Sequence, residues 1–183
     1  MATIQKLIEE LERYGKTKKF KLNDTFIREG QIPNKIGIVK KGLFRYYYLT
    51  SEGKEFTKVF MKEGAIISSY SSMILGTKSI YTIEALEASN VIEISYHQWV
   101  KLREEDNKWD KLLISFLEKG YRTKEKREQT FLLMDAEHRY KEFLLEYPNL
   151  EQRVKQYMVA SYLGITPIAL SRIRKKMKRI NLC

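Results

Sequence analysis

The chain has 183 residues, and its 34 lysines and arginines against 23 aspartates and glutamates give it a formal net charge of +11. A hydrophobic fraction of 43% and a charged fraction of 31% are typical of a folded globular protein and exclude a disordered chain. The only cysteine, Cys183, excludes an intrachain disulfide, a cysteine-rich zinc site and a four-thiolate iron–sulfur cluster, and no apolar run is long enough to cross a bilayer. We therefore expect a cytoplasmic protein with no cofactor, no metal and no membrane anchor. Its positive charge suggests that it binds a polyanion, either nucleic acid or a membrane surface.

The first part of the chain is expected to form a short helix followed by a β-sheet structure. Residues 1–14 place apolar side chains on one helical face. Residues 16–96 then contain short β-branched and aromatic runs separated by turn signals such as Lys41-Gly42, which favours an antiparallel sandwich or roll over βαβ units. The expected strands are Ile36–Val39, Leu43–Leu49, Glu55–Phe60, Ile80–Leu86 and Val91–Ser95.

A long helix is predicted over residues 107–134. Asn107 is a suitable N-cap, Asp110 suits the first turn, and no proline interrupts the segment. At 1.5 Å per residue such a helix is about 40 Å long, which is more than one small domain needs. An apolar series at 4-3-4 spacing therefore predicts a dimer seam, although a helix that packs only on its own sheet is the alternative. The seam residues are Trp109, Leu113, Phe116 and Gly120.

The C-terminal part is expected to be helical and strongly basic. Asp135 can cap a helix that ends before Pro148-Asn149. Residues 151–183 contain a single acid, Glu151, and carry a net charge of +7, which concentrates the charge where a DNA-binding module needs it. Their basic residues are Arg153, Lys155, Arg172, Arg174, Lys175, Lys176, Lys178 and Arg179.

The segment from residue 156 to 179 has the pattern of two helices joined by a turn. Gly164 can end the first helix in a left-handed conformation, and Thr166-Pro167 can cap and begin the second. The alternatives are a basic amphipathic helix that is merely solvated and one that lies on an anionic membrane, and a membrane helix does not explain Gly164 with the Thr166-Pro167 restart. We expect the second helix to enter the major groove of double-stranded DNA. The predicted contact residues are Thr166, Ile168, Ala169, Ser171, Arg172, Arg174, Lys175 and Lys176.

Four stretches together resemble the Crp/Fnr family of bacterial transcription regulators, and in particular its Bacteroidetes-type subgroup. They are TFIREG (Thr25 to Gly30), IGIVKKGLFRYYYLTSEGKE (Ile36 to Glu55), IEALEASNVIEISY (Ile83 to Tyr96) and SYLGITPIALSRIRKK (Ser161 to Lys176).

The resemblance implies an α+β fold in three parts. These are a cyclic-nucleotide-binding-like β-roll (a double-stranded β-helix) over residues 1–106, a dimerisation helix over residues 107–134 and a helix-turn-helix domain over residues 135–183. It further implies a homodimer that reads a palindromic DNA site, with RNA polymerase as a further partner.

The chain departs from the family at the ligand site. Family members that bind cyclic AMP use a Gly-Glu pair and an Arg-Ser/Thr-Ala triplet, whose arginine neutralises the cyclic phosphate. Here these positions fall on Ser68-Ser69 and on Ser79-Ile80-Tyr81, so both charged anchors are missing. Burying a phosphate without its cation is costly, and Lys78 is only a point charge beside the arginine position. We expect Ser68, Ser69, Lys78, Ser79 and Ile80 to line a degenerate effector pocket that does not bind cyclic AMP, and the effector is unknown.

Two further readings of the sequence are considered. An enzyme is not favoured, because the chain has no phosphate-binding glycine loop, no metal-ligand spacing and no nucleophile elbow. A ligand-binding or interaction module with a degenerate helix-turn-helix is the alternative to a DNA-binding regulator. It is raised by Ile168, which stands where family members often carry a glutamate; an isoleucine can contact a thymine methyl instead.

Overall fold

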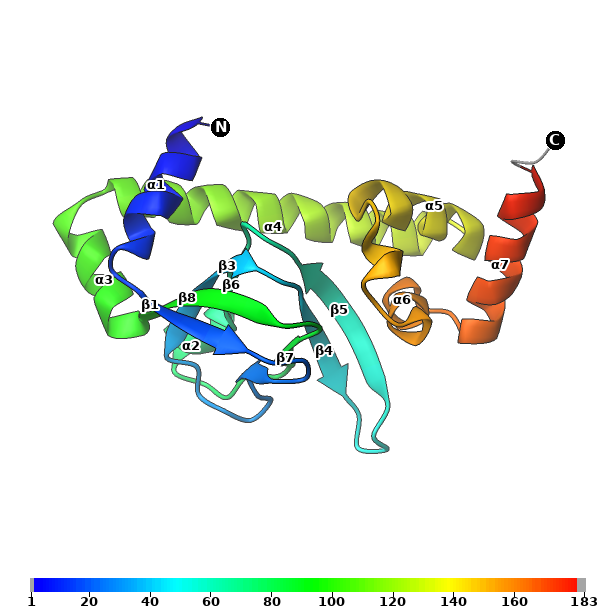
Figure 1. Cartoon of the computed structure of the whole chain (residues 1–183), viewed down its shortest axis with the longest axis horizontal. Coiled ribbons are helices and arrows are strands. Elements are labelled where there is room, and N and C mark those ends of the chain that lie inside the picture. Colours follow the sequence, from blue (N-terminus) through cyan, green and yellow to red (C-terminus); the bar gives the residue numbers. More distant parts are fainter. Residues whose placement is uncertain (1, 181–183) are drawn as a thin grey trace.

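The computed structural model describes the backbone of residues 2–180 and the side chains of residues 4–177, so the expectations for Lys178, Arg179 and Cys183 lie outside the described residues. The protein has an α+β fold in which two four-stranded antiparallel sheets form a jelly-roll-like β-roll (Figure 1). A long helix runs beside the β-roll, and three further helices gather near the end of that helix. The predicted fold class is confirmed.

The elements follow one another as α1 (Ala2–Glu12), β1 (Lys16–Phe20), β2 (Thr25–Ile27), β3 (Lys35–Lys41), β4 (Phe44–Leu49), β5 (Glu55–Met61), β6 (Ile66–Ile67), α2 (Tyr70–Leu75), β7 (Thr82–Ala85), β8 (Ser89–Ser95), α3 (Tyr96–Glu105), α4 (Lys108–Leu133), α5 (Ala136–Glu146), the 3₁₀ turn η1 (Leu150–Gln152), α6 (Gln156–Leu163) and α7 (Pro167–Ile180).

The two sheets enclose an inner core. One has the strand order β1-β8-β3-β6 and the other the order β2-β7-β4-β5, with antiparallel neighbours throughout. Side chains alternate between the two faces of a strand, so Phe44 and Tyr46 on β4 point into the inner core while Arg45 points out of it. All three are buried, which means that the outer face of this sheet is also covered.

Helices cover the outer face of the first sheet. Ile36, Ile38 and Ile94 on that face pack in one cluster with Leu11 of α1 and Trp109 of α4. The predicted amphipathic N-terminal helix is confirmed, and its apolar side is used to close this cluster.

The C-terminal helices cover the outer face of the second sheet. Leu43, Phe60 and Leu86 of the β-roll share a cluster with Phe143 of α5 and Tyr162 of α6. The Phe60 ring lies 6.3 Å from that of Phe143 and 5.8 Å from that of Tyr162. The C-terminal helices and the β-roll therefore share one hydrophobic core. The boundaries at residues 106 and 134 stay a prediction.

Several elements differ from the sequence predictions. The strand expected at Ile80–Leu86 is shorter, since β7 covers Thr82–Ala85 and Ile80 is exposed outside it. The short β1, β6 and α2 carried too little periodicity to be predicted, whereas β2 lies in the TFIREG stretch that the family resemblance marks as a strand and turn. Asn107 makes no side-chain cap, and instead Asp106 Oδ1 accepts a hydrogen bond of 2.9 Å from the backbone N–H of Lys108. The Asp135 cap is confirmed, since its Oδ1 accepts from His138 N at 2.9 Å.

Candidate nucleic-acid interface

The first helix of the predicted pair ends at a left-handed glycine. Gly164 has φ 68° and ψ 33°, and the N–H of Ile165 returns to the carbonyl of Ala160 at 3.0 Å. A Cβ on Gly164 would lie 2.8 Å from a ring carbon of Phe131 on α4. Only glycine therefore meets both the backbone conformation and the close approach at this position.

The second helix begins where the sequence predicts. Thr166 Oγ1 accepts a hydrogen bond of 3.1 Å from the N–H of Ala169, and Pro167 occupies the first helical position. The predicted bounds of α6, the turn and the start of α7 are all confirmed. They depended on local signals, a cap and a helix stop, that act within a few residues.

One side of α7 is buried in its own module. Leu170 is fully buried, and Ile173 and Met177 pack partly buried against the same cluster. Ala160 of α6, also fully buried, offers little bulk where the two helices approach each other. The apolar spacing of α7 is thus explained by packing, and the opposite side is left to solvent.

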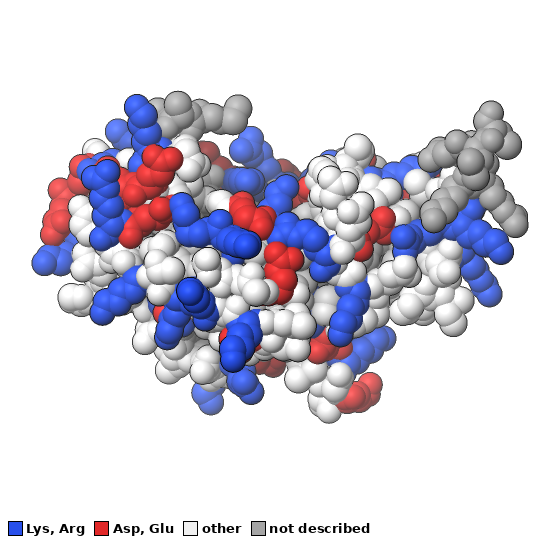
Figure 2. All heavy atoms as spheres, in the orientation of Figure 1, with Lys and Arg blue, Asp and Glu red and all other residues white. Residues whose placement is uncertain are grey.

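The exposed side of α7 carries both apolar and basic groups. Ile168 is 67% exposed, and Ser171, Arg172 and Lys175 lie along the same helix with part or all of their side chains open to solvent. Neither of these two cations forms an ion pair within 4.0 Å with another described residue. Figure 2 shows basic side chains at this end of the molecule, beside the residues drawn in grey.

The other two cations predicted to touch DNA are engaged within the chain. Arg174 Nε lies 3.5 Å from Glu151 Oε1, and Lys176 Nζ lies 2.6 Å from Glu137 Oε2. Ala169 is half-buried. Arg174 and Lys176 therefore have acidic partners on η1 and α5, which leaves Arg172 and Lys175 as the unpaired described cations of α7.

The helix pair is fixed to the β-roll by hydrogen bonds at the outer edge of β5. The N–H of Thr57 donates to Ser161 Oγ at 2.8 Å, and the Ser161 hydroxyl donates to the carbonyl of Glu55 at 3.0 Å. Arg127 of α4 donates to the carbonyls of Lys58 and, at 3.0 Å, of Tyr162. β5 is an edge strand, so these contacts occupy backbone groups that would otherwise have no strand partner.

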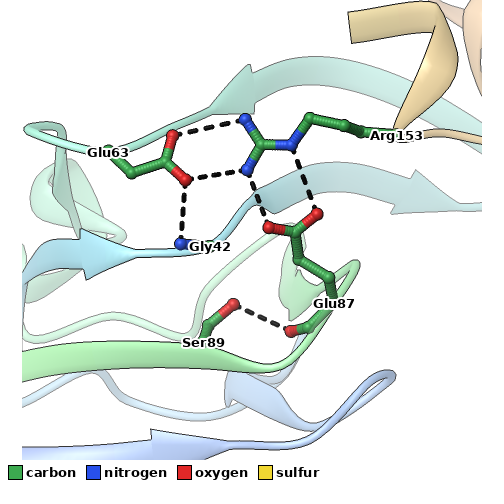
Figure 3. A network of polar contacts seen from close by, with 5 residues as sticks. All are labelled: Gly42, Glu63, Glu87, Ser89 and Arg153. Carbon is green, nitrogen blue, oxygen red and sulfur yellow. Dashed lines mark hydrogen bonds and ion pairs between the residues drawn. The ribbon is translucent and has the colours of Figure 1, made fainter.

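Arg153 makes a further link, drawn in Figure 3. Its Nη2 lies 2.8 Å from Glu63 Oε1 and 2.7 Å from Glu87 Oε1, both on turns of the β-roll. Partial burial works against ionisation of Glu63, but the hydrogen bonds from Arg153 hold the pKa of this carboxyl below its usual value. From the sequence, Arg153 was expected to belong to the positive charge that faces DNA. In the structure it forms ion pairs with Glu63 and Glu87 of the β-roll.

The serines expected in the effector pocket bond to one another and to the backbone. Ser69 and Ser79 are buried with their hydroxyls 3.0 Å apart, and the Ser79 hydroxyl donates to the carbonyl of Tyr81 at 2.7 Å. Ser68 Oγ donates to the carbonyl of Lys35 at 3.1 Å. Lys78 is exposed, as is Ile80. No described cation forms a hydrogen bond with the Ser69–Ser79 pair.

Aromatic rings lie beside these serines. Tyr46 and Tyr81 stack with ring centroids 5.3 Å apart, and Ser68 N donates to the Tyr46 hydroxyl at 2.9 Å. Lys58 Nζ lies 4.1 Å from the Tyr81 ring centroid. Burial lowers the pKa of Lys58 to about 8, and the charges of nearby Lys124 and Arg127 act in the same direction.

The predicted seam on α4 is divided by the fold. Trp109 is 1% exposed in a cluster of its own chain, and Leu113 and Phe116 pack partly buried against the same cluster. Trp109 therefore is not on an exposed seam, contrary to the prediction, because periodicity identifies an apolar face but not what covers it. Gly120 is exposed.

A second apolar series on α4 is open to solvent. Ile114 is 52% exposed, Leu117 49% and Tyr121 67%, at i, i+3 and i+7 spacing. This spacing places them on one helix face, as in a coiled-coil seam.

No described helix is both long and apolar enough to cross a membrane. Within residues 2–180, no group of three or more His, Cys, Asp or Glu side chains is placed to hold a metal ion.

Comparison with known proteins gives a domain family and a fold. Residues 17–106 match the family model of the cyclic nucleotide-binding domain. No curated protein sequence matches the chain significantly.

Solved structures match over almost the whole chain. FixK2 from Bradyrhizobium japonicum has a TM-score of 0.81 at 18% identity, covering 91% of this chain and 86% of its own. The c-di-GMP responsive global regulator CLP from Xanthomonas campestris has a TM-score of 0.77 at 15% identity, with 97% and 93% covered. A CRP/FNR family transcriptional regulator from Thermus thermophilus has a TM-score of 0.73 at 19% identity, with 90% and 86% covered. At these identities the likeness shows a shared fold; of the three proteins, CLP is a global regulator and the Thermus thermophilus protein is a transcriptional regulator.

Proposed function

We propose that this chain is a DNA-binding transcription regulator of the Crp/Fnr type, whose α7 helix enters the major groove. The observation that carries the proposal is the exposed side of α7, where Ile168, Ser171, Arg172 and Lys175 stand on a helix whose other side is buried. Arg172 can donate two hydrogen bonds to a guanine edge, and Ile168 can contact a thymine methyl group. The domain match, the shared fold and the motif resemblance support the same function.

The proposed regulator acts as a homodimer through α4. Its seam consists of Ile114, Leu117 and Tyr121, with Gly120 between them, because these are exposed while Trp109 is not. A two-fold dimer presents two recognition helices about 34 Å apart, one turn of DNA, and so reads a palindrome. Sedimentation measurements are expected to give a dimer, with Leu117→Glu shifting it toward monomer and exposed Leu145→Glu, on α5, as the matched control.

The regulator is not expected to respond to cyclic AMP. The hydroxyls of Ser69 and Ser79 bond to each other, the Ser79 hydroxyl also bonds to the carbonyl of Tyr81, and neither serine offers a cation to a phosphate. Calorimetric titration with cyclic AMP is expected to show no heat, and a micromolar dissociation constant would overturn this part. The Bacteroidetes-type subgroup, RNA polymerase as a partner and a cytoplasmic location stay predictions from the sequence.

Selection from a random DNA pool tests the proposal. The expected result is enrichment of one palindromic site, bound with an affinity that falls steeply as salt is raised. Recovery of no consensus and equal binding to all duplexes would contradict it, and would favour an interaction module whose helix pair no longer reads DNA.

A further inference from the structure

The exposed apolar face of α4 has charges of opposite sign along its two sides. We call the face formed by Ile114, Leu117 and Tyr121 the α4 seam. An α-helix turns by about 100° per residue, so the number of a residue gives its place around the helix. Measured from the middle of the α4 seam, Lys124 lies roughly 50° to one side and Glu125 roughly 50° to the other. Both side chains are exposed.

Lys124 belongs to a group of cations that has no acidic partner in its own chain. Its charge and that of Arg127 both act on the half-buried Lys58 of β5 and lower the pKa of that amine, which shows that the three lie close together. The hydrogen bonds of Arg127 go to backbone carbonyls. Among the described residues no carboxylate lies within 4.0 Å of any of these three cations, whereas nearby Lys126 pairs with Glu142 at 2.6 Å.

The acids beside the α4 seam are unpaired as well. Glu118, Glu125 and Glu128 are exposed, and none of them forms an ion pair within 4.0 Å with the described part of the chain. One copy of the chain therefore leaves charges of both signs on α4 without partners. In coiled coils, charges that flank an apolar seam set the choice of partner and its orientation.

Two-fold symmetry decides which sides of the α4 seam meet. When two identical helices pack side by side in the same direction, the axis between them turns one side of the seam toward the opposite side of its copy. The Lys124 side of one chain then faces the Glu125 side of the other, and the two positions differ by roughly 1.5 Å along the helix. In an antiparallel pair, like sides would meet and like charges would repel.

We infer that Glu125 of the partner subunit pairs with Lys124 across the α4 seam, so that two such pairs flank the seam of the dimer. The inference rests on the proposed homodimer through α4. The partner's carboxylate supplies the negative charge that the group of Lys58, Lys124 and Arg127 lacks in its own chain. A different chain would place another charge opposite Lys124, so the pair also favours a second copy of this chain over other partners.

Mixing two charge-reversed chains tests the pair. In a dimer of Lys124→Glu alone, or of Glu125→Lys alone, like charges meet at both contacts. Each variant alone is therefore expected to have a dimer dissociation constant about tenfold above that of wild type. In an equal mixture the acidic chain meets the basic chain at both contacts, and the mixed dimer is expected to be about as tight as wild type. Sedimentation with a fluorophore on one of the two chains measures the mixed association.

A second mixture controls for net charge. Lys119→Glu and Glu104→Lys change the net charge by the same amounts, and both residues are exposed and unpaired among the described residues. Lys119 lies roughly 170° from the middle of the α4 seam, and Glu104 is on α3. We expect each of these variants to dimerise like wild type and their mixture to show no preference for the mixed dimer.

Glu128 separates the pair from a general effect of acids on α4. It lies within roughly 15° of the middle of the α4 seam, so in a parallel dimer it faces its own copy across the axis. Glu125→Gln removes an attraction and is expected to weaken the dimer severalfold. Glu128→Gln removes a repulsion and is expected to strengthen it, although both variants lose the same charge.

Three results would overturn the inference. They are a mixture of Lys124→Glu and Glu125→Lys that associates no better than either variant alone, a control mixture that gains as much, and equal effects of Glu125→Gln and Glu128→Gln. Circular dichroism shows whether each variant remains folded. A dimer that Leu117→Glu dissociates but that charge reversal leaves intact would remove the pair and keep the proposed function. A dimer with this pair but no sequence-specific DNA affinity would do the opposite, so the two failures are distinguishable.

Discussion

Tyr46 and Arg45 are neighbours on β4 but point into two different regions, and buried polar groups find their hydrogen-bond partners in a different way in each. Tyr46 leads inward to Ser68, Ser69 and Ser79, where hydroxyls within the β-roll bond to one another and to nearby backbone. Arg45 leads outward to the junction with α6, where buried charge is paired and shared hydrophobic core joins segments far apart in sequence. A hydroxyl group can find its hydrogen-bond partners among nearby residues, whereas a buried guanidinium has five donors and a charge and needs partners from several elements. The inner region is therefore self-contained, and the outer region fastens one part of the molecule to the other.

Phe60→Ala tests the outer region most severely. Phe60 is 3% exposed and contacts rings of α5 and α6, so its loss leaves a cavity in the core that both parts share. We expect the free energy of unfolding to fall by about 3–5 kcal/mol. Urea unfolding followed by far-ultraviolet circular dichroism measures it. Phe56→Ala, on the same strand but exposed, is the matched control and is expected to change little.

The number of unfolding transitions in the same experiment tests whether the junction couples the β-roll to the C-terminal helices. Wild type is expected to unfold in one transition, because the β-roll and the C-terminal helices share a core. Two separate transitions in wild type, with Phe60→Ala affecting only one of them, would show that the junction does not couple the two parts.

Ser161→Ala tests the hydrogen bonds at the edge of β5. It leaves the N–H of Thr57 and the carbonyl of Glu55 without their side-chain partner. The expected loss is about 2 kcal/mol, because a buried donor left unpaired costs its desolvation. Exposed Ser71→Ala on α2 is the control. Hydrogen exchange at Thr57 is expected to accelerate, and unchanged protection there would argue against this role for Ser161.

Lys58→Met tests the inner region through pH. Burial lowers the pKa of Lys58 from its ordinary 10.5 to about 8, so between these pH values the folded state binds fewer protons than the unfolded state. The contribution of Lys58 to stability therefore rises with pH across this window, and the gain is lost as pH falls through 8. Lys58→Met is expected to flatten that rise and to stabilise the protein at pH 7 by about 1 kcal/mol, allowing for solvent screening.

The matched control for this pH series is Lys54→Met on the same hairpin, where the lysine is exposed. A difference in stability between wild type and Lys58→Met that stays constant from pH 8 to 10.5 would show that Lys58 is not held in an unfavourable charged state.

The sequence predicted well what local signals determine. Gly164 and the pair Thr166-Pro167 place the turn and the start of α7 correctly because caps and helix stops act over a few residues. The apolar face of α7 followed from its spacing, with Leu170 buried as expected.

Contacts between residues far apart in the sequence could not be predicted from these local signals. Trp109 and the exposed Ile114 both satisfy a helical period, and only the packing of α1 and α3 decides which of them is covered. Arg45 stands in a strand beside hydrophobic neighbours, and nothing local to it indicates that Glu55 and Glu84 would bury it beneath α6. The positive charge expected to face DNA was overestimated for the same reason, because a count of basic residues does not show which of them have acidic partners. Three of them do in the structure, namely Arg153, Arg174 and Lys176.

DNA binding by α7 is tested by comparing two of its cations, Arg172 and Lys175. Anisotropy titrations of wild type, Arg172→Ala, Lys175→Ala and the Lys19→Ala control would use the selected palindrome and a scrambled duplex across a salt series. Arg172→Ala is expected to cost about 1–3 kcal/mol per half-site on the palindrome and little on the scrambled duplex, while Lys175→Ala weakens both equally and lowers the salt slope by about one. Equal losses on both duplexes for Arg172→Ala, or no loss for either variant, would contradict the claim that the exposed side of α7 reads DNA.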